Sequence, residues 1–99
     1  MQTLRDVLVN VAGRGDTITY EELRSRVGLT GDIVPALRAL SEDEDDAGRG
    51  LLTAVVVRAD TGRPGNGWFR LASERGRDVT HADAAWQAER ARLREVHGG

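Results

Sequence analysis

Apolar residues recur with helical spacing at the start of the chain. In the segment LRDVLVNVA they stand at i, i+3, i+4 and i+7, counted from Leu4, so that they share one side of an α-helix. Gly13 and Gly15 follow and end the pattern. The sequence therefore predicts an amphipathic first helix with one buried side.

A second helix is predicted after a short extended piece, TIT. Thr19 and Glu22 have the spacing of a capping box, in which each side chain reaches an unpaired backbone N–H at the helix start. The helix is expected to run from Tyr20 to Val27 and to stop at Gly28.

A third helix can begin at Thr30 or Asp32. Pro35 is tolerable in its first turn, where N–H groups have no intrahelical partner, and apolar residues recur from Ile33 to Leu40. Five consecutive acids, residues 42–46, then stand near its C-terminus, where the macrodipole disfavours negative charge. We expect this run to reduce stability slightly unless basic groups offset it.

The second half of the chain opens with patterns typical of strands. Residues 51–57, LLTAVVV, form an apolar, β-branched run, and GWFRLA alternates so that Phe69 and Leu71 share one face and Trp68 and Arg70 the other. The connecting stretch is rich in glycine. The two segments are therefore predicted to pair as an antiparallel hairpin.

The chain closes with a further helical pattern. Thr80 and Asp83 have cap spacing, and the segment ADAAWQAERARLRE places Trp86 and Leu93 on one side of a helix. Residues 95–99 are expected to fray.

The predicted order is helix, short strand, helix, helix, strand, long turn, strand, helix. That is the order of a winged helix-turn-helix, an α+β fold in which a three-helix core is followed by a β-hairpin wing. We therefore expect one winged-helix domain over residues 1–99 with a C-terminal helix.

Composition excludes several kinds of chemistry. The 99 residues include no cysteine and no lysine, and all 14 basic residues are arginine. Disulfides, thiolate nucleophiles, cysteine-ligated zinc and lysine-based catalysis are thus ruled out, whereas arginine suits phosphates and base edges. No apolar stretch is long enough to span a bilayer, and MQTLRDVL lacks signal-peptide features, so we expect a cytoplasmic protein without a membrane partner.

Charge is unevenly distributed along the chain. Residues 1–50 carry six arginines and ten acids, and residues 51–99 carry eight arginines and six acids, within an overall net charge of −2. A nucleic-acid contact would therefore have to be local and lie mainly on the C-terminal half.

The segment TITYEELRSRVGL resembles the entry into the DNA-binding helical domain of alkylguanine-DNA alkyltransferases and alkyltransferase-like proteins. The resemblance implies a winged helix. The proline-cysteine-histidine-arginine motif of that family has no counterpart, since the corresponding region reads LLTAVVVRAD, so alkyl transfer is excluded. Residues 17–72 also resemble a small bacterial domain pattern that implies no activity.

The loop TGRPGNG does not favour nucleotide binding. The spacing of its glycines fits neither common phosphate-binding motif, and the loop precedes a predicted strand. Its glycines are better explained by the positive φ angles of a long turn. We also find no spacing that favours a metal site, a cofactor site or a catalytic group, and therefore expect no enzyme.

The leading hypothesis is a non-enzymatic module that binds DNA mainly through the wing, with help from the second and third helices. An exposed tryptophan beside arginines suits base stacking and phosphate contact, although burial of Trp68 in the core is an equal alternative. The residues expected to contact DNA are Arg24, Arg26, Arg38, Arg58, Arg63, Asn66, Trp68 and Arg70.

The alternative hypothesis is a winged helix that binds a protein partner or a second copy of itself. The wing and the acidic end of the third helix would form that interface, since Trp and Arg are common interface anchors. The net negative charge favours this alternative, because the acids at residues 42–46 would repel phosphates near the third helix.

Overall fold

The computed structural model describes residues 3–98. In chain order the elements are α1 (Leu4–Gly13), β1 (Ile18–Thr19), α2 (Tyr20–Val27), α3 (Val34–Asp46), the 3-10 helix η1 (Leu52–Val55), β2 (Val56–Val57), α4 (Asn66–Glu74) and α5 (Ala82–Gly98). Over residues 3–98 the domain is mostly helical, with five α-helices and a single sheet of two short strands.

The two helices predicted at the N-terminal end are confirmed. Thr3 caps α1: its Oγ1 accepts a hydrogen bond from the Asp6 N–H at 3.1 Å, and the Asp6 carboxylate accepts one from the Thr3 N–H at 3.3 Å. Thr19 caps α2 by accepting from the Glu22 N–H at 3.2 Å. α2 ends at Gly28, whose φ of 68° gives the left-handed cap that glycine adopts without strain.

The third predicted helix is also confirmed, as α3. The Asp32 carboxylate accepts a hydrogen bond from the Val34 N–H at 3.0 Å, and Pro35 occupies the first turn. Leu37 faces the core. The helix continues through the acidic residues to Asp46, so these acids belong to its last turns.

The predicted β-hairpin wing does not form within residues 3–98, and the assignment as an α+β winged helix is therefore wrong. β2 pairs with β1, and the pair is parallel, with Ile18 opposite Val56 and Thr19 opposite Val57. The segment expected as the second wing strand is the helix α4.

The alternation of residues 68–71 was misleading because four residues fit both periodicities. Trp68, Leu71 and Ala72 stand at i, i+3 and i+4, and all three are buried along one side of α4. As a helix the segment satisfies its backbone hydrogen bonds locally and buries the indole ring. Arg70 lies on the exposed side.

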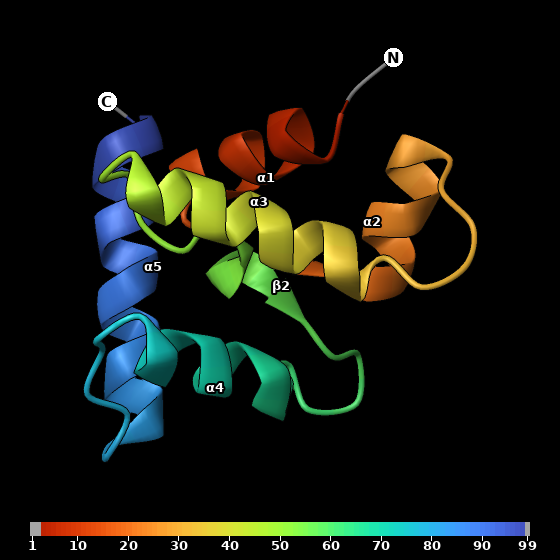
Figure 1. Ribbon diagram of the computed structural model, residues 1–99. Helices are drawn as coiled ribbons and strands as arrows, with labels where there is room; N and C mark the ends of the chain where they lie inside the picture. Colours follow the sequence, from red (N-terminus) through yellow and green to blue (C-terminus); the bar gives the residue numbers. More distant parts are fainter. Residues whose placement is uncertain (1–2, 99) are drawn as a thin grey trace.

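The C-terminal helix completes the core. In Figure 1, α5 runs along one side of the molecule next to α1, α4 lies near the first half of α5, and α3 crosses in front of the short strand β2. Trp86 and Leu93 are buried as predicted, and the Trp86 indole N–H donates to the Ala54 carbonyl at 2.7 Å. α5 continues through residues 95–98 of the expected frayed tail, and Gly99 lies outside the described residues.

The acidic end of α3 is neutralised by arginines from other elements. The carboxylate of Glu44, which is only 2% exposed, accepts hydrogen bonds from Arg5 and Arg49 at 3.0 and 2.9 Å. The hydrogen bond from Arg49, assisted by the charge of Arg5, lowers the pKa of Glu44 despite its burial. Arginines thus offset the charge of this buried acid, which was the condition under which the acidic run would cost little stability.

A second group of charges joins α3 to α5. The Arg77 guanidinium donates to Asp45 at 2.6 Å and to Glu89 at 3.0 Å, and Glu89 also accepts from the Leu51 N–H at 2.9 Å. Arg75 adds a further hydrogen bond to Asp45 at 3.0 Å. Hydrogen bonds from Arg77 and then Arg75 lower the pKa of Asp45. These bonds fix the loop after α4 between two helices.

None of the helices within residues 3–98 is both long and apolar enough to cross a bilayer.

Candidate functional site

Three depressions adjoin one another where β1 leads into α2 and where the loop of residues 58–65 leads into α4. The first depression lies between α2, α3 and α4, the second lies at the start of α2, and the third lies beside the loop of residues 58–65. Tyr20 lines both the first and the second, and Arg58 lines both the second and the third. Gly67 of the first and Asn66 of the third are neighbours in sequence. Among the residues that line them we define the arginine face as Tyr20, Arg24, Arg38, Arg58, Arg63 and Asn66. Two carboxylates, Glu21 and Asp60, also line the second depression.

The first depression is apolar and encloses about 180 Å³. Its walls are formed by Tyr20 at the start of α2, Leu37 of α3 and Trp68 of α4, with Arg38 at one side. Burial raises the pKa of the Tyr20 hydroxyl, and the nearby charge of Arg58 opposes this shift in part. A planar or aliphatic group fits the chemistry of these walls.

Trp68 does not have the exposed position that the strand interpretation gave it. It is 6% exposed, and the core alternative is therefore the one that applies. Its indole N–H is buried and has no hydrogen-bond partner within residues 3–98. Trp68 thus forms a wall of the first depression, and stacking of a base on an open indole is ruled out.

The loop of residues 58–65 is closed by its own backbone. The Arg58 N–H donates to the Arg63 carbonyl at 2.9 Å, and the Gly62 N–H donates to the Arg58 carbonyl at 2.8 Å. Gly62 has a φ of 66°, which agrees with the predicted turn role of a glycine in this loop. The loop therefore holds Arg58 and Arg63 close together in the third depression.

The guanidinium groups of these two arginines are anchored but exposed. Arg58 donates to both carboxylate oxygens of Asp60, at 3.1 and 2.8 Å. Arg63 pairs with Asp83 and lies over the ring of Phe69, with its guanidinium carbon 5.7 Å from the ring centroid. All four charged side chains are more than two-fifths exposed, so each pair contributes about 1 kcal/mol or less to stability.

Arg24 and Arg38 reach the same face from α2 and α3. Arg24 donates to the Gly31 carbonyl at 3.1 Å. Arg38 pairs with Glu74 at 2.8 Å and with Glu42 at 3.6 Å, again among exposed side chains.

Two predicted contact residues lie elsewhere. Arg26 pairs with Glu22 at 3.3 Å along α2, and Arg70 projects from the exposed side of α4. Neither lines any of the three depressions formed by the described residues. The other predicted contact residues line adjoining depressions: Arg24, Arg38, Arg58, Arg63 and Asn66. Trp68 forms a wall of the first depression, beside Arg38.

Sequence reasoning did not single out Tyr20, although two of the depressions share it. The available signal was its position directly after the helix cap Thr19, where an aromatic ring stands at the junction of a strand and a helix. Without the parallel pairing of β1 and β2, nothing placed this junction beside residues 58–65.

Two hydroxyl groups at the first depression bond to each other. Thr53 lines the first depression, but its Oγ1 is 2.6 Å from the Ser41 Oγ, and Ser41 also accepts from the Thr53 N–H at 3.0 Å. A hydroxyl nucleophile needs an adjacent base, and these two side chains bond to each other. What the face offers is guanidinium and amide donors around an apolar depression.

Comparison with known proteins found no matching family model, curated protein or solved structure.

Proposed function

We propose that this protein is a non-enzymatic DNA-binding module whose contact surface is the arginine face. The observation that carries the proposal is that four arginines and Asn66, from three helices and one loop, line three adjoining depressions. This surface replaces the predicted wing.

The chemistry of the face suits phosphate groups. Guanidinium groups form bidentate, charge-assisted hydrogen bonds with phosphate oxygens. The partners that now hold Arg38, Arg58 and Arg63 are exposed carboxylates, and such pairs are weak enough to exchange for phosphates. The N-terminus of α4 lies at Asn66 beside these arginines and favours an anion in the same place.

The positions of α2 and α3 support the same function. Arg24 of α2 and Arg38 of α3 bring guanidinium groups to the arginine face from two consecutive helices. The first half of α3 carries Arg38 next to the first depression, whereas Glu44 and Asp45 lie at its other end and are held by arginines. Glu44 and Asp45 are therefore offset where they lie, whereas Glu42 pairs with Arg38 of the arginine face.

A fluorescence anisotropy titration with a short DNA duplex at low salt tests the proposal. We expect binding that is lost in the double variant Arg58→Gln, Arg63→Gln. The matched control is Arg14→Gln, Arg92→Gln, which removes the same charge from residues outside the face. Absence of binding by the native chain, or equal loss in the control, would show that the proposal is wrong.

A second candidate function is docking of a protein partner in the apolar first depression. It is favoured by Val34, which lines this depression at the start of α3 and is 54% exposed. The acidic end of α3, expected earlier as part of such an interface, is taken up by arginines of the same chain. A homodimer in light scattering that Val34→Asp dissociates, without any DNA binding, would favour this candidate.

A further inference from the structure

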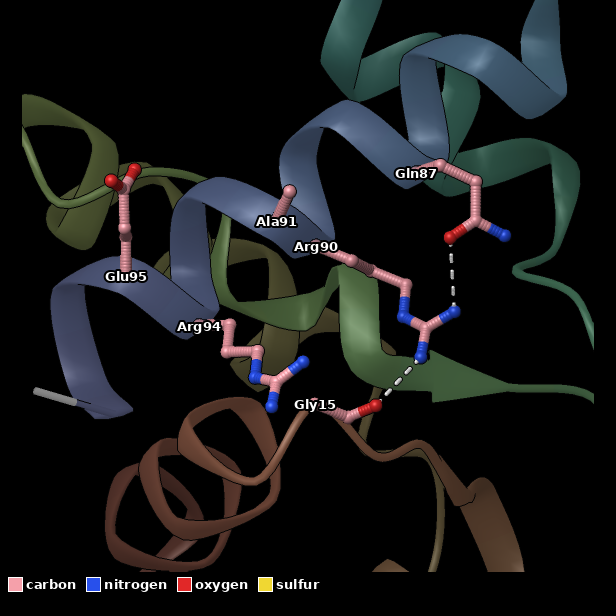
Figure 2. A pocket seen from close by; sticks show the side chains of 6 residues that line it. All are labelled: Gly15, Gln87, Arg90, Ala91, Arg94 and Glu95. Carbon is pink, nitrogen blue, oxygen red and sulfur yellow. Dashed lines mark hydrogen bonds between the residues drawn. The ribbon is translucent and has the colours of Figure 1, made fainter.

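A pocket away from the arginine face lies between α5 and the turn that follows α1. It encloses about 560 Å³ and is lined by Gly15 and by Gln87, Arg90, Ala91, Arg94 and Glu95 of α5. Figure 2 shows the guanidinium groups of Arg90 and Arg94 extending from α5 toward Gly15. In Figure 1, α5 and the α2 end of the arginine face lie on opposite sides of the molecule. We call this site the α5 pocket.

Arg90 is fixed in the α5 pocket by uncharged groups. Its guanidinium donates to the Gly15 carbonyl at 3.0 Å and to the Gln87 side-chain oxygen at 3.2 Å (Figure 2). The guanidinium carbon lies 5.2 Å from the centroid of the Trp86 ring. Its buried Nε has no hydrogen-bond partner among residues 3–98. The charge of Arg90 is therefore oriented but not neutralised by a carboxylate.

Arg94 adds a second charge one helical turn away. A β-carbon built on Gly15 would lie 3.1 Å from the Arg94 Cδ and 3.3 Å from its Nε, so the Arg94 side chain packs across this glycine. Within the described part of the chain neither Arg90 nor Arg94 forms a salt bridge, although nine other arginines do. Like charges at i and i+4 repel each other.

Glu95, which lines the pocket, and Asp16, which follows Gly15, form no salt bridge with Arg90 or Arg94 within residues 3–98. Glu95 follows Arg94 in sequence, but Figure 2 shows its side chain directed away from the two guanidinium groups. Asp16 follows Gly15 and pairs with Arg14 at 3.5 Å. The α5 pocket therefore presents two adjacent positive charges toward an open space.

We infer that the α5 pocket binds a phosphate group. A dianion between Arg90 and Arg94 replaces their repulsion with two charge-assisted interactions, and its tetrahedral oxygens accept from both guanidinium planes. The inference is independent of DNA binding at the arginine face.

Isothermal titration of the whole chain with inorganic phosphate, at constant ionic strength set with chloride, tests this inference. We expect saturable binding that Arg94→Gln weakens about tenfold or more, since one charged hydrogen-bond partner is removed. The control Arg92→Gln removes the same charge from the same helix, outside the pocket, and should bind phosphate like the native chain. No binding by the native chain, or equal weakening in both variants, would overturn the inference.

Two further arms keep the test informative. Added phosphate should raise the thermal midpoint of the native chain and raise that of Arg94→Gln less; equal shifts in the two would contradict binding at this pair. Duplex DNA binding by Arg94→Gln identifies the source of the phosphate. Unchanged affinity indicates a free phosphate or a small phosphate ester, and a parallel loss indicates the DNA backbone. Arg58→Gln, Arg63→Gln should retain phosphate binding even where DNA binding is lost.

Discussion

At the scale of single residues, the most connected side chain is Arg77. It bridges Asp45 of α3 and Glu89 of α5, and Glu89 is only 4% exposed. The hydrogen bonds to Asp45 and Glu89 raise the pKa of Arg77, so it stays charged. Removing Arg77 would leave a buried carboxylate whose remaining protein donor is the Leu51 N–H.

We predict that Arg77→Met lowers the free energy of unfolding by about 3 kcal/mol, because an uncompensated charge stays buried. Arg70→Met is the control, since Arg70 is exposed, and should change the free energy of unfolding by about 0.5 kcal/mol or less. Urea denaturation measures both values. Similar values for the two variants would show that the bridge contributes little.

The same network predicts how stability depends on pH. Since the pKa values of Glu44 and Asp45 are lower in the folded than in the unfolded chain, their contribution is complete above the unfolded pKa values and is lost as the pH falls. We expect the free energy of unfolding of the native chain to decline below about pH 5. The free energy of unfolding of Asp45→Asn should decline less steeply, because the variant lacks one of these carboxylates. If the free energy of unfolding of Asp45→Asn fell with pH as steeply as that of the native chain, Asp45 would not contribute to the pH dependence of stability.

At the scale of elements, the helices with long periodic patterns were predictable and residues 51–74 were not. α1, α2, α3 and the buried side of α5 follow from apolar spacing and from caps such as Thr19. The run at residues 51–57 is buried almost throughout, and such a run has no periodicity that distinguishes a strand from a 3-10 turn. The pairing of β2 with β1 depends on contacts between distant segments.

The predicted site was affected by the same error. Arg58, Arg63 and Asn66 lie on one face because their loop is closed locally, so a turn of either kind would have kept them together. Trp68 and Arg70 changed position because their orientation depends on whether the segment is a strand or a helix. Tyr20 and the α5 pocket depend on tertiary packing and could not be found from spacing alone.

Gly67 distinguishes the helix α4 from the predicted hairpin. It occupies the first turn of α4, and a β-carbon there meets no atom within 4 Å. We predict that Gly67→Ala raises the free energy of unfolding by about 0.5 kcal/mol, because alanine favours the helix and restricts the unfolded chain.

Gly62→Ala is the matched control for this substitution. Gly62 also has open space around it but has a φ of 66°, so the substitution should lower stability by about 1 kcal/mol. Thermal or urea unfolding measures both variants. Destabilisation by Gly67→Ala similar to that of Gly62→Ala would indicate a turn at residue 67 and contradict the helix.

At the scale of the whole molecule, most of the 14 arginines fall into three sets. Arginines of the first set pair with the acidic end of α3 and include Arg49, Arg75 and Arg77. Arg90 and Arg94 line the α5 pocket. The third set belongs to the arginine face and consists of Arg24, Arg38, Arg58 and Arg63. Three arginines of the face, Arg38, Arg58 and Arg63, each pair with an exposed carboxylate. A local contact to a polyanion therefore requires phosphate groups to displace these carboxylates.

The salt dependence of duplex binding tests the role of the arginine face most directly. Each phosphate neutralised by an arginine contributes a slope of about −0.9 to log K against log salt, so the four arginines of the face predict a slope of about −3 to −4 for the native chain. Arg58→Gln, Arg63→Gln should reduce the slope by about 2. A slope near zero, or one that this double variant leaves unchanged, would contradict DNA binding through the arginine face.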